Sequence, residues 1–496
     1  MSETMQKLRA LEKRMYAYNY AMSLMETDEA TVGPSGGGEG RTEALEVLSG
    51  ALYNLIAGDE LPRLLDAAQH EALDEQAAAE VRELRDKNDQ YTKVPAEEYA
   101  AGTRLMANCR MAWHRAKQAN DFSIYAPWLE QMVDNRRRWA EYFAPGQDAF
   151  ATWLDQNQKG LTVAETDAFF TALREVIVPL LRRLQTEGTA PRTDFLKGTW
   201  PIEKQRALSA YVMQVMGLDP AHCALGETEH PFTQELYNDD VRITTHYYEQ
   251  DMISNLFSVI HEGGHALYEL HVSDDLRYTA ITGGSCIGLH ESQSRLFENY
   301  VGRSREFLAF LWPKLTELFP ENLAGVTCEE FYRAVNKVEP SLIRTEADEL
   351  TYALHVMVRY ELEKQLLRGT LAVKDLPAAW NRMYKEYLGV EVPDDARGVM
   401  QDVHWSQGGF GYFPGYALGT AYAAQMIHQM KQTVDFAGCC ATGNLKPILD
   451  YQTEHLWQYG KMRTPDVLIR QACGGDFDPS YFVRYLEEKY TDIYQL

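Results

Sequence analysis

Apolar residues recur at intervals of three and four positions through most of the first two hundred residues. This spacing lines apolar side chains along one face of a helix, and the helix-favouring residues Ala, Leu, Glu and Arg dominate the same stretches. The clearest stretches are 43–56, 63–86, 122–143 and 163–186. They are bounded by residues that favour turns, namely Gly33 to Gly40, Pro95, Pro145-Gly146 and Pro191. The pattern resumes beyond residue 300, so we expect a mostly α-helical protein.

The stretch VGPSGGGEG at 32–40 is the one low-complexity piece of the chain. Its glycines predict a flexible loop between two helices, and a hinge or a lid over a site is the alternative. The stretch lacks the G-x-x-x-x-G-K-[ST] pattern of a phosphate-binding loop.

One segment departs from the helical pattern. Residues 241–248 (VRITTHYY) are rich in β-branched and aromatic residues and follow the turn-like sequence Asn238-Asp239-Asp240. This composition predicts a β-strand within one small sheet. A strand of this kind can pair with the extended backbone of a bound peptide.

Composition and charge exclude several classes of protein. The 45% apolar and 24% charged residues are ordinary for a globular protein, and the net charge of −24 disfavours nucleic acid and anionic membranes as partners. No run approaches 18 uninterrupted apolar residues, and the N-terminal segment MSETMQKLRALEKRM lacks the apolar core of a secretion signal. The 7 cysteines are scattered without C-x-x-C spacing, so we expect a cytoplasmic protein with neither a disulfide framework nor a thiolate metal site.

Seven of the 13 histidines lie between positions 222 and 290, and this clustering indicates a site. Within it, His261, Glu262 and His265 form an H-E-x-x-H motif. Residues four apart share one face of a helix, so both imidazoles can bind one metal ion, with Glu262 near enough to take a proton from water on that ion. Gly263 and Gly264 cost about 1 kcal/mol each relative to alanine inside a helix, which indicates close approach of another backbone or a substrate.

A catalytic zinc site needs a third protein ligand and one open position. The sequence HESQSR at 290–295 offers candidates on a predicted second helix. Glu291 follows His261 by 30 positions (261 to 291), and a helix–loop–helix fold-back can bring it to the metal. His290 and Glu269 are the alternative donors, and spacing alone favours none of them strongly.

The chain resembles the carboxypeptidase Taq family of metallocarboxypeptidases in six ordered signatures. They are H-P-F at 230–232, D-x-R-x-T at 240–244, H-E-x-x-H at 261–265, H-E-S-Q at 290–293, I-R-x-x-A-D at 343–348 and G-x-x-Q-D-x-H-W at 398–405. Weaker similarity extends toward both ends, for example from Trp113 to Phe122. The chain departs from the family at Leu24-Met25-Glu26, where Trp-Asp is common, and at 224–229 before H-P-F. Both departures concern substrate preference rather than metal chemistry.

This resemblance implies a mostly α-helical fold with a deep substrate groove and one small β-sheet beside the zinc helix, as in the angiotensin-converting-enzyme and neurolysin relatives. Residues 1–496 are expected to form a single catalytic domain with two helical lobes around the groove. The glutamate of H-E-S-Q is the third ligand in the family. The resemblance therefore assigns His261, His265 and Glu291 to one divalent metal ion, with zinc expected before cobalt, and it implies homodimers.

The activity implied is hydrolysis of the C-terminal bond of peptides, with broad specificity and release of single amino acids. Glu262 is expected to accept the proton of the attacking water and pass it to the leaving amine. An exopeptidase must also recognise a free carboxylate, and the guanidinium fork of Arg344 matches one through two parallel hydrogen bonds. The alternative is an ion pair between Arg344 and Asp348 on one helix.

Stabilising the oxyanion requires donors aimed at it. His404 and Tyr416 resemble the histidine and tyrosine that do this in the related helical metallopeptidases, with Tyr412 as the second choice of tyrosine. A structural role in a packed Gly-rich loop is the alternative for these aromatics.

Residues near the strand are expected to have lesser roles. His230 and Phe232 are candidates to line the substrate groove, and a structural turn is the alternative for both. Asp240 and Arg242 are expected to hold the sheet rather than to contact the substrate.

Two other functions compete with this one. Within peptidases, an endo-oligopeptidase or a dipeptidyl carboxypeptidase is the alternative, because the wider helical group includes both. From another class, a non-catalytic peptide-binding scaffold is the remote alternative. The presence of Glu262 and of all three expected ligands argues against it.

Overall fold

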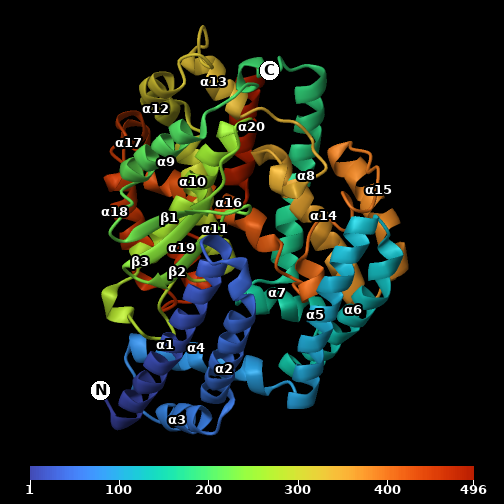
Figure 1. The fold of residues 1–496 in the computed structure, drawn as a ribbon, viewed down its shortest axis with the longest axis vertical. Helices are drawn as coiled ribbons and strands as arrows, with labels where there is room; N and C mark the ends of the chain where they lie inside the picture. The colour runs from blue at the N-terminus through green and yellow to red at the C-terminus, as the bar shows by residue number, and fades with distance from the viewer.

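Twenty α-helices and one small β-sheet make up the protein, and the computed structural model describes all 496 residues. The helices are α1 (Glu3–Thr31), α2 (Gly38–Ala57), α3 (Glu60–Ala68), α4 (Glu75–Thr92), α5 (Ala96–Ala119), α6 (Phe122–Phe143), α7 (Ala149–Asn157), α8 (Val163–Thr186), α9 (Ile202–Met216), α10 (Met252–Leu270), α11 (Ile287–Arg295), α12 (Arg305–Leu318), α13 (Cys328–Val335), α14 (Glu349–Arg368), α15 (Leu376–Leu388), α16 (Pro414–Met430), α17 (Phe436–Thr442), α18 (Lys446–His455), α19 (Pro465–Cys473) and α20 (Ser480–Tyr494). Helices α1 to α4 form one end of the molecule, and the sheet lies on the opposite side from α5, α6 and α15 (Figure 1). The expectation of a mostly helical protein with a small sheet is confirmed. None of the helices combines the length and the apolar character needed to cross a membrane.

Helices α1 to α4 pack around a hydrophobic core of their own. It contains 12 buried residues, including Leu8 and Leu84, and is separate from the core of 104 residues in the rest of the chain. The prediction of one helix over 63–86 is wrong, because α3 and α4 divide this stretch. Asp74 begins α4 by accepting a hydrogen bond from the Ala77 N–H at 2.8 Å, and such a cap marks the start of a new helix.

Capping residues also set the ends of the other predicted helices. Helices α6 and α8 cover the predicted stretches 122–143 and 163–186. The Thr162 hydroxyl accepts from the Glu165 N–H, and the Glu165 carboxylate accepts from the Thr162 N–H, which is a capping box at the start of α8. The glycine-rich segment after α1 is only partly a loop, because a turn of 3-10 helix at Ser35–Gly37 leads directly into α2.

The sheet has three strands, β1 (Cys223–Glu227), β2 (Thr233–Tyr237) and β3 (Asp240–Thr245), in the order β1-β3-β2. Strand β3 pairs parallel with β1 and antiparallel with β2. The predicted strand over 241–248 is therefore present but ends at Thr245. Both of its edges are bonded within the sheet, so the expectation that it pairs with a peptide is wrong, and β2 is the strand with a free edge that also contacts α10.

Helix α10 carries the H-E-x-x-H motif and packs against β3, β2 and α11. Its start is capped by Asp251, whose carboxylate accepts from the Ser254 N–H at 3.0 Å. A Cβ at Gly264 would lie 2.7 Å from the carbonyl oxygen of Gln293 on α11. The expected close approach of another backbone is thus confirmed at this glycine, since any side chain would force the two helices apart.

Helix α11 lies between α10 and α16. It continues into a π-helix, η4 (Leu296–Gly302). On its other side, a Cβ at Gly419 of α16 would lie 2.7 Å from Cβ of Glu291. Two glycine contacts therefore hold α11 close to both neighbours, and its polar residues are enclosed between them.

Candidate active site

Three side chains that can bind a metal converge between α10 and α11. His261 and His265 lie one turn apart on α10, and Glu291 on α11 faces them. The Oε2 atom of Glu291 lies 3.9 Å from Nε2 of His261 and 3.6 Å from Nε2 of His265. One ligand atom from each residue lies within 4.8 Å of the other two. The fold-back expected from the sequence therefore brings these three residues together.

The other ring nitrogen of each histidine is held by a second partner. Nδ1 of His261 lies 2.8 Å from Oε2 of Glu298, and Nδ1 of His265 lies 2.6 Å from Nδ1 of His290. A ring held through Nδ1 presents Nε2 to the centre, as metal-binding histidines commonly do. Glu298 was not anticipated, although it follows Glu291 by seven positions, which is two helical turns.

His290 and Glu269, the alternative donors, bond each other instead of facing the centre. Nε2 of His290 lies 2.7 Å from Oε1 of Glu269. The Gly284 N–H donates to both oxygens of that carboxylate at 3.1 Å. Both ring nitrogens of His290 are therefore in hydrogen bonds, one with Glu269 and the other with Nδ1 of His265. His290 and Glu269 together hold the His265 ring from its Nδ1 side.

Glu291 is surrounded by hydrogen-bond donors. The Arg295 Nε–H donates to Oε1 at 2.7 Å, and the Ser294 hydroxyl donates to Oε2 at 3.2 Å. Burial alone would raise the pKa of Glu291, but Arg295 and the two histidines outweigh it and hold the pKa well below its usual range. The carboxylate is therefore ionised at neutral pH, as a metal ligand must be.

The donor set fits a divalent metal ion. Two imidazoles and one carboxylate are the protein ligands of many catalytic zinc sites, in which a fourth position stays open. Bond lengths of about 2.0–2.1 Å put two donors on a tetrahedral zinc ion about 3.3 Å apart. The separations of 3.6 and 3.9 Å found here need only a small inward movement to match.

Glu262 lies beside the two histidines and bonds to the sheet. The Thr233 hydroxyl on β2 lies 2.6 Å from its carboxylate and 3.0 Å from its carbonyl oxygen. Burial raises the pKa of Glu262, which makes its carboxylate a stronger proton acceptor. Sequence reasoning missed Thr233, and its position directly after H-P-F was the one available signal.

Arg344 is buried with its guanidinium fork on Asp402. Nε and Nη2 donate to Oδ1 of Asp402 at 3.1 and 2.9 Å, and Nη1 donates to the Tyr352 hydroxyl at 3.0 Å. A guanidinium has five N–H groups, so these three bonds leave two free. Pairing with Asp348 is wrong, because that carboxylate instead caps α14 by accepting from the Thr351 N–H at 3.0 Å.

His404, Tyr412 and Tyr416 form an aromatic group beside Arg344. The centre of the His404 ring lies 5.6 Å from that of Tyr412 and 6.3 Å from that of Tyr416, and the Arg344 guanidinium lies 5.1 Å from the Tyr416 ring. Burial lowers the pKa of His404 to about 4, so the ring is neutral at neutral pH and keeps one N–H. Burial raises the pKa of both tyrosines, with a further contribution from Glu291, so both hydroxyls stay protonated close to that carboxylate.

Glu363 on α14 holds both ends of the segment that carries His404 and Tyr412. Its Oε1 accepts from the Trp405 indole N–H at 2.6 Å, and its Oε2 accepts from the Gly411 N–H at 2.9 Å. Trp405 follows His404 directly, and Gly411 directly precedes Tyr412. Sequence reasoning missed Glu363, because its partners lie 42 and 48 positions away and no local pattern marks it.

His230 and the segment around Arg344 lie toward the same end of β2. His230 is exposed and precedes the strand. Burial lowers the pKa of His246, which follows β3, while Glu346 acts in the opposite direction and His230 adds to the lowering. The Thr228 hydroxyl lies 2.9 Å from the His230 carbonyl oxygen and 2.7 Å from the Thr244 hydroxyl, which places His230 at the end of β3 that precedes His246. Arg242 bonds Asp240, two residues earlier on the same strand β3, through two hydrogen bonds of 3.0 Å.

Comparison with known proteins identifies the family. A family model for carboxypeptidase Taq (M32) metallopeptidases matches residues 7–490. The chain belongs to this family. It is 37% identical over 489 residues to carboxypeptidase 1 of Bacillus subtilis, with 98% of each chain covered. It is 34% identical to thermostable carboxypeptidase 1 of Pyrococcus furiosus, with 99% of each chain covered. The crystal structure of an M32 carboxypeptidase from Deinococcus radiodurans R1 superposes with a TM-score of 0.97 at 36% identity, covering 100% of both chains.

Family membership establishes the coarse function. The chain is a metallocarboxypeptidase, as the six signatures implied. A metallopeptidase requires a divalent metal, and the group formed by His261, His265 and Glu291 is available for it. The helical fold with its small sheet is the fold of the solved M32 carboxypeptidases.

Proposed function

We propose that this metallocarboxypeptidase removes single amino acids from the C-termini of peptides with broad specificity, and that His261, His265 and Glu291 bind a zinc ion. The convergence of these three donors, with each imidazole held through Nδ1, is the observation that carries the proposal. When bound, the ion polarises the scissile carbonyl and lowers the pKa of the attacking water. The same donors suit cobalt, and metal analysis of the purified protein distinguishes the two.

Glu262 is the general base in this proposal. It accepts the proton of the attacking water and passes it to the leaving amine. The bond of 2.6 Å from the Thr233 hydroxyl orients its carboxylate, and burial strengthens its affinity for the proton. Thr233 is therefore a positioning residue for the base.

His404 and Tyr416 donate hydrogen bonds to the negative charge that develops on the carbonyl oxygen. A neutral histidine and a protonated tyrosine are both donors, and donors held in place before the reaction stabilise this charge most effectively. Tyr412 is the second choice of tyrosine and otherwise lines the substrate site. Glu363 keeps this group in position through Trp405 and Gly411.

Arg344 binds the C-terminal carboxylate of the substrate through its two free N–H groups. Asp402 and Tyr352 occupy the other donors and fix the plane of the guanidinium. A planar fork held in this way matches a carboxylate better than a flexible ammonium group does. His230, at the same end of β2, lines the site for the released residue.

The substrate backbone pairs with the free edge of β2. The Phe232 carbonyl oxygen accepts from the Thr244 N–H at 2.9 Å and so faces β3. Bonding direction alternates along a strand, so the backbone groups of Thr233 face away from β3. A peptide added at this edge lies directly beside Glu262.

Product analysis separates this activity from its rivals. We expect the metal-loaded enzyme to release single residues in sequence from a peptide with a free C-terminus and to leave the C-terminal amide of the same peptide nearly untouched. Release of dipeptides indicates a dipeptidyl carboxypeptidase. Equal cleavage of acid and amide indicates an endo-oligopeptidase, which needs no free carboxylate.

The remaining features of the proposal concern the whole molecule. Residues 1–496 form a single catalytic domain whose two helical lobes enclose a deep groove, in the manner of the angiotensin-converting-enzyme and neurolysin relatives. The protein acts as a homodimer in the cytoplasm, and its seven unpaired cysteines fit a reducing compartment. Light scattering on the purified protein tests the dimer.

A further inference from the structure

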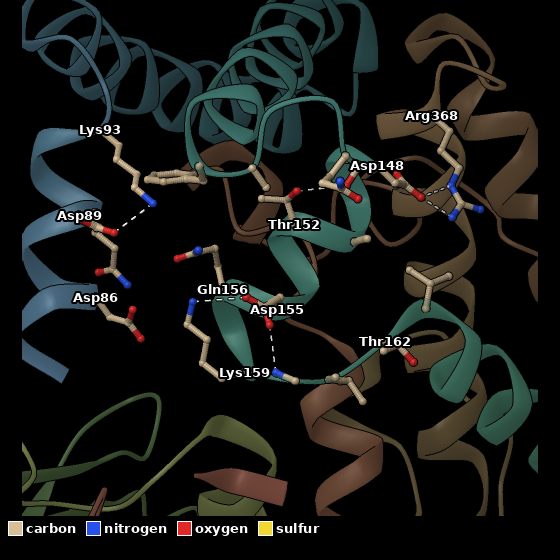
Figure 2. Close-up of a pocket in the computed structure, with 18 residues that line it drawn as sticks. Asp86, Asp89, Lys93, Asp148, Thr152, Asp155, Gln156, Lys159, Thr162 and Arg368 are labelled. Carbon is tan, nitrogen blue, oxygen red and sulfur yellow. Dashed lines mark hydrogen bonds and ion pairs between the residues drawn. The ribbon is translucent and has the colours of Figure 1, made fainter. Parts of the chain in front are cut away.

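Two cavities lie between the N-terminal unit α1–α4 and the rest of the protein, and they differ in how their charges are satisfied. The first has a volume of about 520 Å³ and lies between α4 and α7 (Figure 2). Each of its three cations is paired with a carboxylate of the same lining, in the pairs Lys93–Asp89, Lys159–Asp155 and Arg368–Asp148. This cavity offers no unpaired cation to a ligand.

The second cavity has a volume of about 280 Å³ and lies between α1, α4, β2 and the loop that precedes α11. Its lining includes two carboxylates, of Glu12 and Glu235, and two ammonium groups, of Lys87 and Lys461, and no ion pair joins any of them. Oε1 of Glu12 accepts from the Ala280 N–H at 2.7 Å, while Oε2 is buried without a partner. The Glu235 carboxylate and both ammonium groups make no hydrogen bond. Glu12 is the buried member of the four, and a buried polar group normally has a partner for each oxygen, so its second oxygen needs a ligand or water. Glu235, Lys87 and Lys461 are half-exposed and open to the same ligand.

The pKa shifts of Glu12, Glu235 and Lys87 agree with this interpretation. Burial raises the pKa of Glu12 to about 8 and that of Glu235 to about 7, and burial lowers the pKa of Lys87. Each shift marks a group that has lost water without gaining a bonded partner of opposite charge.

The second cavity lies further along β2 from the point where Thr233 contacts Glu262. Thr233 bonds Glu262, and Glu235 lies two residues further, about 7 Å along the strand and on the same face. Glu235 also lies close enough to Glu269, two turns after Glu262 on α10, for their charges to interact. Arg344 lies on the other side of the metal group from Glu269: it bonds Tyr352, whose ring lies 4.6 Å from the guanidinium of Arg295 on α11, whereas Glu269 bonds His290 near the start of α11. A peptide with its C-terminus at Arg344 therefore runs toward Glu235.

We propose that this second cavity binds the amino terminus of a short peptide substrate, with the α-ammonium held by Glu235 and with Glu12 at the far wall. The inference rests on the proposed function, because Arg344 supplies the direction of the peptide. The ammonium group would lie about two or three residues before the scissile bond. With the one residue that is released, the substrate is a tripeptide or a tetrapeptide. Lys87 and Lys461 face the same cavity, so an acidic first side chain is preferred over a basic one.

The decisive experiment compares a tetrapeptide that has a free α-amine with its N-acetyl form, using the metal-loaded full chain. We expect acetylation to lower kcat/KM about tenfold, mainly through KM, because it removes one charge-assisted contact. We expect Glu235→Gln to lower kcat/KM for the peptide with a free α-amine to the value that the wild type shows for the acetylated peptide. The same substitution leaves kcat/KM for the acetylated peptide unchanged. Glu46→Gln removes the same charge from an exposed position of α2 and changes neither rate.

A second pair of peptides tests the lysines. We expect a tetrapeptide that begins with Glu to be hydrolysed about fivefold faster, as kcat/KM, than one that begins with Lys, and Lys87→Met to remove most of this preference. Equal rates for these two peptides in the wild type overturn the role of the lysines.

Other outcomes separate this inference from the function on which it rests. Release of single residues at equal rates from the free and acetylated peptides overturns the amino-terminal site alone, as does an equal loss on both peptides in Glu235→Gln. Failure of the wild type to release single residues from either peptide overturns the carboxypeptidase proposal itself. A thermal melt of each variant confirms that it is folded.

Discussion

The group proposed to bind the metal and the group proposed to face the substrate are built in different ways. His261, His265 and Glu291 come from two consecutive helices, α10 and α11, and each has its own supporting partner. Arg344 and Tyr416 belong to the second group, whose members come from separate segments of the chain. Local helix geometry thus determines most of the first group, while the second depends on how distant segments pack.

The two groups also differ in how their support is shared. Asp402 accepts from Arg344 through Oδ1 and from Arg359 through Oδ2, at 2.7 Å for the Arg359 Nε–H. Glu363 similarly supports both ends of the segment from His404 to Tyr412. A change at one supporting residue of the second group therefore moves several side chains. In the first group each support contacts one of the three residues directly, and Arg295 and Glu298 are also joined to each other, at 3.0 Å. The following substitutions test this contrast, from the largest expected effect to the smallest.

Removing the carboxylate that faces the two histidines has the largest expected effect. We expect Glu291→Ala to lose the metal and with it essentially all activity, because two imidazoles alone bind a divalent ion weakly. His290→Ala and Glu269→Ala are expected to weaken binding by about 10–100-fold without abolishing it, since they act through His265. Metal per chain after dialysis against buffer is the measurement. If His290→Ala lost the metal while Glu291→Ala kept it, the ligand set would be wrong.

Glu262→Gln isolates the chemistry from the metal. The glutamine keeps the size of the side chain but cannot accept the proton of the attacking water, so we expect kcat to fall about 1000-fold with metal content unchanged. Thr233→Val is the companion variant and is expected to reduce kcat by less, because it removes only the bond that orients the base. Near wild-type activity in Glu262→Gln with metal retained would refute the general-base role.

Arg344→Ala tests the substrate-facing group. Loss of two charge-assisted hydrogen bonds to the C-terminal carboxylate is expected to lower kcat/KM about 100-fold on a free-acid peptide, with little effect on its amide. Arg344→Lys is expected to recover only part of this loss, because an ammonium group lacks the planar fork. Arg242→Ala serves as the matched control, since Arg242 bonds Asp240 on the sheet. An equal loss on acid and amide would make Arg344 a purely structural partner of Asp402.

Glu363→Gln has the smallest expected effect and tests shared support. Both carboxylate oxygens accept from N–H donors, so an amide nitrogen in place of one oxygen faces a donor and breaks one of the two bonds. We expect kcat to fall about tenfold with KM and metal content little changed, because oxyanion donors lose alignment while the metal group is untouched. Glu361→Gln, on the same helix and paired with Lys364 at 3.2 Å, is the control. A loss confined to KM would show that Glu363 supports substrate binding instead.

The sequence by itself determined the helical class, the extents of α6 and α8, and the family, through six signatures in order. It also determined that His261 and His265 share a helix face, because a helix repeats every 3.6 residues and neighbours four apart need no tertiary contact to align. Glu291 became the expected third ligand only through the resemblance, since spacing left His290 and Glu269 open.

Only the tertiary structure decided which residues support the site. It gave β3 the central position in the sheet, joined Arg344 to Asp402 rather than to Asp348, and brought Thr233 to Glu262. These contacts join segments that lie 58 positions apart for Arg344 and Asp402 and 29 positions apart for Thr233 and Glu262. No periodicity in a sequence encodes such a distance, because it depends on how whole helices pack against each other and against the sheet.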